Sequence, residues 1–377
     1  MSVDSPGLSP QLEAEQAVLG ACLLAPAQLA ALREWLEPRH FLRPAHGQFF
    51  AVLLAQFDES PLPTTDDQRR DWALRAMASG TGSIPGFSAS YGQSLISACP
   101  TAAHAAAYGR MVLETAVRRA LEQHAHRLLA AAEGGSVRST VDLTAALHTV
   151  IGQLTTAWGT IDVRSTKPLP SPDAETGLRS GRAAEAARDN ERMLLATLIE
   201  SPERIGEIAA WLTDGDFLAP EHRAVYQALT ALAHRGEPVD ELTALWEVQR
   251  RGALATGTTT VEEVRRLVAP GMPGDPDYWA ERVLRASLLR ASATSAGIVR
   301  VLALDASVSA GTLLGDSLRA LEPADQLQQR HRAAIGSAGP ERRGPVVLGA
   351  RRQAATRTTA GPDRSARPAA EPSPPRR

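Results

Sequence analysis

The residues best placed to form a functional site in this sequence of 377 residues occur in pairs. His46 and His222 are separated by 176 positions, and so are Glu15 and Glu191. Equal positions suggest a shared site. However, each histidine falls in the first turn of an expected helix, where capping and packing explain it, and a glutamate in a first turn is stabilised by the helix dipole. A structural role is therefore favoured for all four residues.

The sequence contains none of the catalytic motifs considered below. An ATPase needs a phosphate-binding loop of the form G-x-x-x-x-G-K-[ST], but the single lysine, Lys167, has no glycine before it in Arg-Ser-Thr-Lys-Pro. Gly80 and Gly82 belong to an expected loop that follows no strand. No G-x-S-x-G motif and no zinc-binding pair of histidines occurs, and Cys22 and Cys99 alone form no metal site. We therefore predict no catalytic residue, cofactor or metal.

Arginines near the C-terminus are candidates for binding phosphates. Residues 330–377 hold eleven arginines and three acidic residues, although the whole chain has a formal charge of −2, so the remaining body is acidic. A flexible Gly/Pro-rich segment of this kind can neutralise DNA phosphates without reading bases. The predicted contacts are Arg342, Arg343, Arg351, Arg352 and Arg357. The alternative is a solubilising tail.

The elements that would position these residues form a module that occurs twice. Residues 15–53 and 191–229 align without a gap, and ten of the 39 paired positions are identical. Apolar positions match while charged positions differ, which is typical of a duplicated core with two independent surfaces. Pro26 and Pro44 open helices in the first copy, and prolines hold the same positions in the second.

Three short motifs carry a family resemblance. Glu-Gln-Ala-Val-Leu-Gly at 15–20, Phe41 before Pro-x-His at 44–46, and Gly-Glu-Pro-Val-Asp at 236–240 resemble the N-terminal domain of DnaB-type replicative helicases. In that family the domain forms the collar of the hexamer, pairs through a helical hairpin and contacts primase. The resemblance therefore implies a role in DNA replication or primosome assembly, with a helicase or primase as partner.

The resemblance and the helical periodicity together predict an all-α protein of two tandem modules, each a small bundle followed by a C-terminal helical hairpin. We expect copy one at 1–160, a flexible linker at 161–182, copy two at 183–325 and a disordered basic tail at 326–377. No signal peptide and no run of about 18 apolar residues is evident, which favours a cytoplasmic protein without membrane contact.

Each expected hairpin has an apolar seam that needs more cover than two helices provide. The seams comprise Leu113, Val117 and Leu121 in copy one and Val283, Leu284 and Leu288 in copy two. A flexible linker of about 23 residues spans roughly 25 Å, so the two hairpins could meet within one chain. We therefore predict self-association of the hairpins inside the chain.

The favoured function is a non-catalytic, replication-associated assembly module. One alternative is an accessory subunit of a split replicative helicase whose ATPase is on another chain. Another is a DNA-binding regulator that acts through its basic tail. Association with a helicase or primase would favour the first two, and salt-dependent DNA binding that requires the tail would favour the third.

Overall fold

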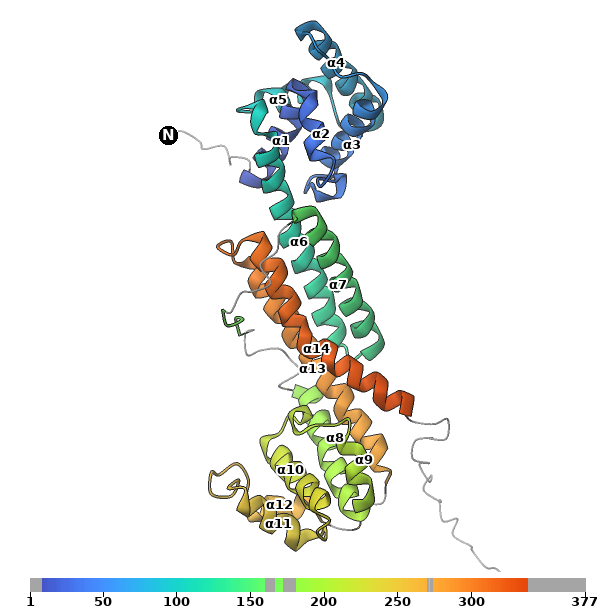
Figure 1. Cartoon of the computed structure of the whole chain (residues 1–377), viewed down its shortest axis with the longest axis vertical. Helices are drawn as coiled ribbons and strands as arrows, with labels where there is room; N and C mark the ends of the chain where they lie inside the picture. The colour runs from blue at the N-terminus through green and yellow to red at the C-terminus, as the bar shows by residue number, and fades with distance from the viewer. Residues whose placement is uncertain (1–8, 160–166, 172–180, 270, 272–273, 338–377) are drawn as a thin grey trace, which may run out of the picture. The chain divides into compact units, whose positions relative to one another are not determined.

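The computed structural model describes residues 9–159, 167–171, 181–269, 271 and 274–337 (Figure 1). Within these ranges all regular secondary structure is helical, which confirms the predicted all-α class. Copy one comprises α1 (Pro10–Leu24), α2 (Leu29–Leu32), α3 (Pro44–Glu59), α4 (Asp66–Ser83), α5 (Ala89–Ser97), α6 (Ala105–Glu133) and α7 (Val137–Trp158). Copy two comprises α8 (Gly181–Glu200), α9 (Ile205–Ala209), α10 (Pro220–Arg235), α11 (Glu241–Arg250), α12 (Val261–Leu267), α13 (Pro276–Leu304) and α14 (Ala310–Ser337).

Short 3-10 turns join several of these helices. The two that matter for the site are η2 (Pro38–His40) before α3 and η5 (Asp214–Asp216) before α10. They hold equivalent places in the two copies. The others are η1 (Pro26–Gln28), η3 (Ala102–His104) and η4 (Pro202–Arg204).

Local chemistry explains where the helices begin. Proline occupies the start of α1, α3, α10 and α13, where its missing N–H costs no intrahelical hydrogen bond. The side chains of Thr65 and Asp240 cap α4 and α11 by accepting a backbone N–H. Ser9 at the N-cap of α1 forms no such side-chain bond.

Each copy has an apolar core organised around its first helix. The apolar face of α1 is buried and consists of Val18, Leu19, Cys22 and Leu23. The same face of α8 consists of Leu194, Leu195 and Leu198, with Ile199 partly buried. Burial raises the pKa of the Cys22 thiol, so this residue acts as a small apolar side chain.

A glycine in the 15–20 motif allows close contact between two helices of copy one. A Cβ atom at Gly20 would lie 2.1 Å from the carbonyl oxygen of Leu95 in α5. Any side chain here would therefore push α5 away from α1. The glycine of the motif is explained by packing rather than by chemistry.

Three boundaries differ from the sequence prediction. Gly80 and Gly82 lie inside α4 rather than in a loop, because the 66–83 helix continues to pack through the buried Gly80. Helix α8 already begins at Gly181, inside the predicted linker. Helix α14 continues past the predicted domain end at 325, to Ser337.

The extension of α14 has a packing cause. Leu327 and Ala334 are buried in the core cluster of copy two, so the helix gains apolar contacts beyond Pro323. Arg330 thus belongs to a structured helix and not to the tail. The described helices all lie within one unit, Met1–Arg342.

Among the described residues, one helix is long and apolar enough by composition to cross a membrane. This is α13, whose most apolar window has a mean hydropathy of 1.3. However, 56% of that window is buried inside the protein, as is usual for a core helix. A bent pair, Pro10–Leu24 with Pro26–Leu32, passes the same test only if the two pieces are taken together.

Candidate functional site

The four hairpin helices α6, α7, α13 and α14 lie side by side (Figure 1). They share an apolar interior. Its buried members are Val117, Leu121, Ala125 and Leu128 of α6; Leu147, Ile151 and Leu154 of α7; Ala296, Val299, Leu302 and Ala303 of α13; and Ala310, Leu313, Leu314, Ala320 and Leu321 of α14. A two-helix hairpin alone has no such interior. Each hairpin therefore buries apolar side chains against the other.

An arginine joins the two hairpins at the tip of the second one. The guanidinium of Arg118 in α6 donates to the carbonyl oxygen of Asp305 at 2.7 Å and also to that of Val308. These carbonyls lie in the turn between α13 and α14, where helical partners are missing. Arg118 thus satisfies backbone acceptors that the turn leaves open.

A second polar contact joins α7 to α14. Nε2 of His148 lies 2.9 Å from a carboxylate oxygen of Asp325, and both side chains are about one third exposed. The linker also touches the bundle, because Arg319 of α14 donates to the carbonyl oxygen of Lys167 at 3.2 Å. These contacts connect segments of both copies.

The residues predicted for the hairpin interface are divided between three clusters. Val117 and Leu121 lie in the shared interior. Leu113 lies instead in the core of copy one, and Val283, Leu284 and Leu288 lie in the core of copy two. This corrects the expected seam for those four residues.

The physical reason is helix length. Both α6 and α13 have 29 residues, which at 1.5 Å per residue gives about 44 Å. The first half of each helix completes the core of its own module, and only the second half reaches the bundle. Leu128 and Val299 continue the same apolar period further along the two helices.

The arginines predicted to contact DNA, Arg342, Arg343, Arg351, Arg352 and Arg357, lie outside the described residues. Within the described part of α14, Arg330 forms an ion pair with Asp216 at 2.6 Å and so serves copy two. Beyond the end of α14, residues 338–377 contain nine arginines and three acidic residues.

The repeated glutamates and histidines form buried pairs. Glu15 lies 2.7 Å from Nδ1 of His46, and Glu191 lies 2.9 Å from Nδ1 of His222. Each carboxylate also accepts two backbone N–H groups at the entry to the next long helix, those of Leu42 and Arg43 in copy one. The glutamates therefore stabilise the N-terminus of α3 and α10 rather than the first turn of their own helix.

Arginines on the hairpin helices donate hydrogen bonds to the 3-10 turns η2 and η5 and to the residue that follows η2. Arg119 of α6 donates to the carbonyl oxygens of His40 and Phe41, each at 3.2 Å, and Arg290 of α13 donates to that of Asp216. Burial lowers the pKa of Arg119, and the nearby Glu15 carboxylate opposes this shift. Each arginine thus connects a hairpin helix to the turn that precedes α3 or α10, which is a structural task.

No group of three or more His, Cys, Asp or Glu side chains within the described ranges is placed to hold a metal ion. The buried Glu–His pairs direct their polar atoms at backbone and at each other, and Nε2 of His46 also lies 2.6 Å from the hydroxyl of Tyr91. Their geometry supports folding rather than proton transfer to a bound molecule.

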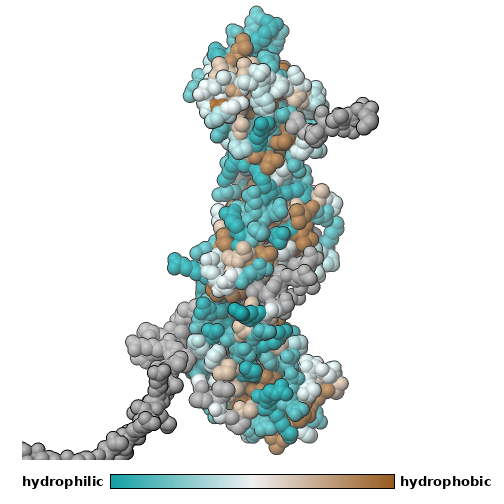
Figure 2. All heavy atoms as spheres, turned by 180° about the vertical axis from the view of Figure 1, so that it is seen from behind, coloured by the Kyte–Doolittle hydropathy of each residue, from teal (hydrophilic) through white to brown (hydrophobic). Residues whose placement is uncertain are grey.

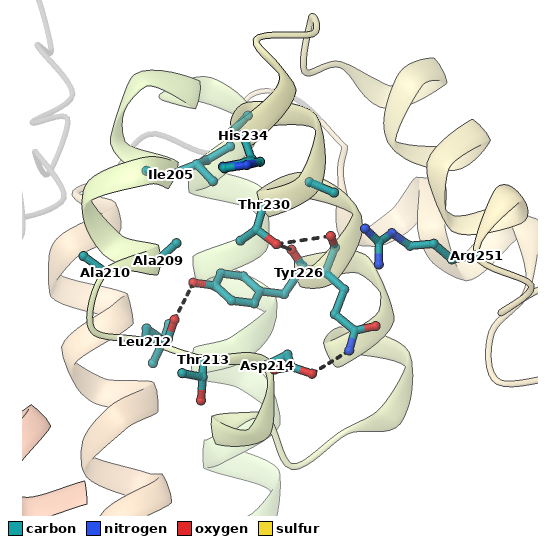
Figure 3. A pocket seen from close by; sticks show the side chains of 14 residues that line it. Ile205, Ala209, Ala210, Leu212, Thr213, Asp214, Tyr226, Thr230, His234 and Arg251 are labelled. Carbon is teal, nitrogen blue, oxygen red and sulfur yellow. Dashed lines mark hydrogen bonds between the residues drawn. The ribbon is translucent and has the colours of Figure 1, made fainter. Parts of the chain in front are cut away.

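A pocket of about 690 Å³ lies between α9 and α10 of copy two (Figure 3). Its wall includes Ala209, Thr230 and His234, and the hydroxyl of Tyr226 donates to the carbonyl of Leu212 at 3.0 Å. In copy one the position of Ala209 is taken by Arg33, which forms an ion pair with Asp58 at 2.6 Å. Copy one thus has a charged, paired side chain where copy two has the small Ala209.

Exposed apolar residues also differ between the copies. Leu242 and Trp246, one turn apart on α11, are 72% and 65% exposed. At the same distances from its N-cap, α4 of copy one carries Asp67 and Asp71. Figure 2 shows a surface that is mainly hydrophilic, with apolar residues in small groups.

Comparison with known proteins gives one family. The family model of the DnaB-like helicase N-terminal domain matches residues 8–114 and 184–271, which correspond to the two copies. No solved structure matches this chain.

Three curated relatives share this similarity. A replicative DNA helicase DnaB of Geobacillus stearothermophilus is 36% identical over 110 residues, 29% of this chain and 23% of that protein. That of Mycobacterium leprae is 39% identical over 64 residues, 17% of this chain and 11% of the relative. That of Leifsonia xyli subsp. xyli is 28% identical over 129 residues, 31% of this chain and 28% of the relative. The similarity thus covers less than a third of each relative.

Proposed function

Because this chain belongs to the family of DnaB-like helicase N-terminal domains, we propose that it is a non-catalytic assembly module of DNA replication that binds a replicative helicase or a primase. Its working part would be the two tandem domains, copy one at 1–160 and copy two from 183 to the end of α14. The matched relatives are helicases by name, and the similarity lies in the N-terminal domain, which is not the catalytic part.

The observation that carries this proposal is the shared interior of the four hairpin helices. DnaB N-terminal domains take part in helicase oligomerisation and contact primase, and their hairpins pair. A chain that pairs two such hairpins internally would carry a ready-made dimer unit. It would then present its remaining surfaces to other replication proteins.

The exposed pair Leu242 and Trp246 is the surface best suited to a protein partner. Tryptophan is enriched among residues that dominate binding energy at interfaces, and Trp246 is the most exposed of the six tryptophans. Copy one has aspartates at the equivalent places, so an apolar pair is not needed for the fold. We propose that α11 contributes to partner binding.

A direct binding assay tests the proposal. The purified chain would be mixed with the replicative helicase and the primase of the same organism, and binding would be measured by biolayer interferometry. Replacing Leu242 and Trp246 by Asp introduces the copy-one residues and should weaken binding at least tenfold. The matched control is Leu74→Asp, which changes an exposed leucine of α4 and should have no effect. Lack of binding to both proteins would refute the proposal.

Two other functions remain as alternatives. A split helicase would require that the chain stimulates DNA unwinding by an ATPase on another chain. A DNA-binding regulator would act through the nine arginines of residues 338–377. Each of these functions is consistent with a cytoplasmic protein, which we also propose.

A further inference from the structure

A second pocket, of about 450 Å³, lies at the start of α5 in copy one. Its lining combines one arginine, one tyrosine and three serines with apolar residues: Arg43, Tyr91, Ser88, Ser90, Ser94, Ala45, Pro85, Gly86 and Phe87. No carboxylate is among them. A pocket with a cation, several hydroxyls and no acidic group favours an anionic ligand.

Arg43 is the positive charge of this pocket. Its guanidinium donates to the hydroxyl of Tyr91 at 3.0 Å and lies over the tyrosine ring, 5.3 Å from the ring centre. It forms no ion pair with a carboxylate of the described residues. A guanidinium has five N–H donors, so most of them remain for a ligand.

Buried side chains hold Tyr91 in position. Its hydroxyl lies 2.6 Å from Nε2 of His46, whose Nδ1 contacts Glu15 at 2.7 Å. The rings of Tyr91 and Phe87 are perpendicular, and their centres lie 5.7 Å apart. Arg43 and Tyr91 are therefore held in place before any ligand arrives, and such preorganisation lowers the entropic cost of binding.

Copy two shows that these two residues are not required by the fold. The buried pair of Glu191 and His222 is present there, but Ala219 replaces Arg43. Thr260 caps α12 through the N–H of Glu263, just as Ser88 caps α5 through that of Tyr91. Copy two thus has a carboxylate where copy one has the tyrosine, and it lacks the cation.

We propose that the pocket at Arg43 and Tyr91 binds the phosphate group of a nucleotide, either free or within single-stranded DNA. The planar guanidinium and the serine hydroxyls match the acceptor oxygens of a phosphate. The pocket volume exceeds that of a phosphate alone, which leaves space for the attached sugar. This site is separate from the bundle and from α11, so it does not depend on the proposed function.

The test uses the full chain and three probes: ATP, a ten-nucleotide oligo-dT and inorganic phosphate. Binding of labelled ATP and of the oligonucleotide would be measured by equilibrium dialysis and anisotropy, with phosphate as competitor. Arg43→Ala, which introduces the copy-two residue, should weaken binding about tenfold, because it removes charge-assisted hydrogen bonds. Tyr91→Phe should weaken binding less, since Arg43 keeps its charge and loses only its hydrogen bond to the tyrosine hydroxyl.

The matched control is Arg75→Ala, which removes an exposed arginine of α4 and leaves the basic C-terminal segment unchanged. The control should bind like the unmutated chain, and phosphate should compete. Preference for ATP or for the oligonucleotide identifies the source of the phosphate. The proposal fails if no probe binds saturably, if phosphate does not compete, or if Arg43→Ala and Arg75→Ala bind equally while both keep the thermal stability of the unmutated protein.

Discussion

At the scale of single residues, the buried glutamates connect the first helix of each copy to the helix that follows. Glu15 is 2% exposed and Glu191 is 1% exposed, yet each has backbone and imidazole partners for its oxygens. Removing the carboxylate would leave two backbone N–H groups and a histidine nitrogen without acceptors. The cost of such losses exceeds that of a surface ion pair.

Glu15→Ala is therefore expected to lower the free energy of unfolding by about 3 kcal/mol. Urea denaturation followed by circular dichroism measures this. Glu13→Ala, on the exposed face of the same helix, should change it by less than about 0.5 kcal/mol. Equal effects of the two substitutions would contradict the assigned role of Glu15.

The stability of copy one should also depend on pH through His40. Burial lowers the pKa of His40 to about 4, while its Nδ1 accepts the backbone N–H of Glu37 at 3.0 Å. The unfolded chain binds a proton near pH 6.5 but the folded chain does not, so stability falls as the pH decreases from 6.5 towards 4. We expect a loss of roughly 2 kcal/mol over this range.

The variant His40→Asn keeps an acceptor for the N–H of Glu37 but does not titrate. Unfolding curves at pH 7 and pH 4.5 should show a smaller loss for this variant than for the unmutated chain. An identical loss in both proteins would exclude His40 as the cause.

The sequence predicted these residues only in part. The offset of 176 identifies Glu15 with Glu191 and His46 with His222, and a structural role was the favoured interpretation. It does not reveal that glutamate and histidine contact each other, because they are 31 positions apart and that contact depends on how α1 crosses α3. The contact between Tyr91 and His46 was missed for the same reason.

At the scale of elements, apolar periodicity predicted the helices and the hairpins well. It could not assign each residue of a long helix to a neighbour, because the period is the same in the half that faces the module and in the half that faces the other hairpin. Leu113 and Val283 therefore appeared equivalent to Leu121, although they lie in different cores. Helix α14 continues past the predicted domain end at 325, because Leu327 and Ala334 pack in the core of copy two.

Leu121→Asp tests the bundle. Leu121 is fully buried, so a carboxylate there should lower the free energy of unfolding by about 4 kcal/mol or open the bundle and expose apolar surface. Binding of the dye ANS and sedimentation velocity would detect the exposed surface and any aggregation. Leu74→Asp, at an exposed leucine, is the control and should behave like the unmutated protein. Unchanged sedimentation and stability for Leu121→Asp would contradict the packing.

At the scale of the whole molecule, the acidic body and the basic C-terminal residues predict that the full chain and a shortened chain bind DNA differently. The full chain should bind DNA weakly and without sequence preference, with affinity that falls steeply as salt rises. A chain ending at Ser337 keeps all described helices and should lose most of this binding. Fluorescence anisotropy at several salt concentrations measures both. Equal binding by the two chains would remove the C-terminal arginines from DNA binding.

The family assignment was made from three short motifs and is confirmed. Those motifs encode helix starts and core packing, so they predict the fold more directly than the function. The partner cannot be derived in this way, because partner contacts depend on surface residues that differ even between the two copies, as Leu242 and Asp67 show.

The shared interior of the four hairpin helices implies that the two copies pair within a single chain. The most direct test is a distance measurement by double electron–electron resonance between spin labels at Thr149 of α7 and Gln326 of α14, which flank the contact of His148 with Asp325. The labels would be placed in a Cys99→Ser background, since Cys22 is buried. We predict one narrow distribution at short distance, unchanged on dilution with unlabelled chain and broadened by Leu121→Asp. A broad distribution in the unmutated protein, or one that disappears on dilution, would contradict the claim.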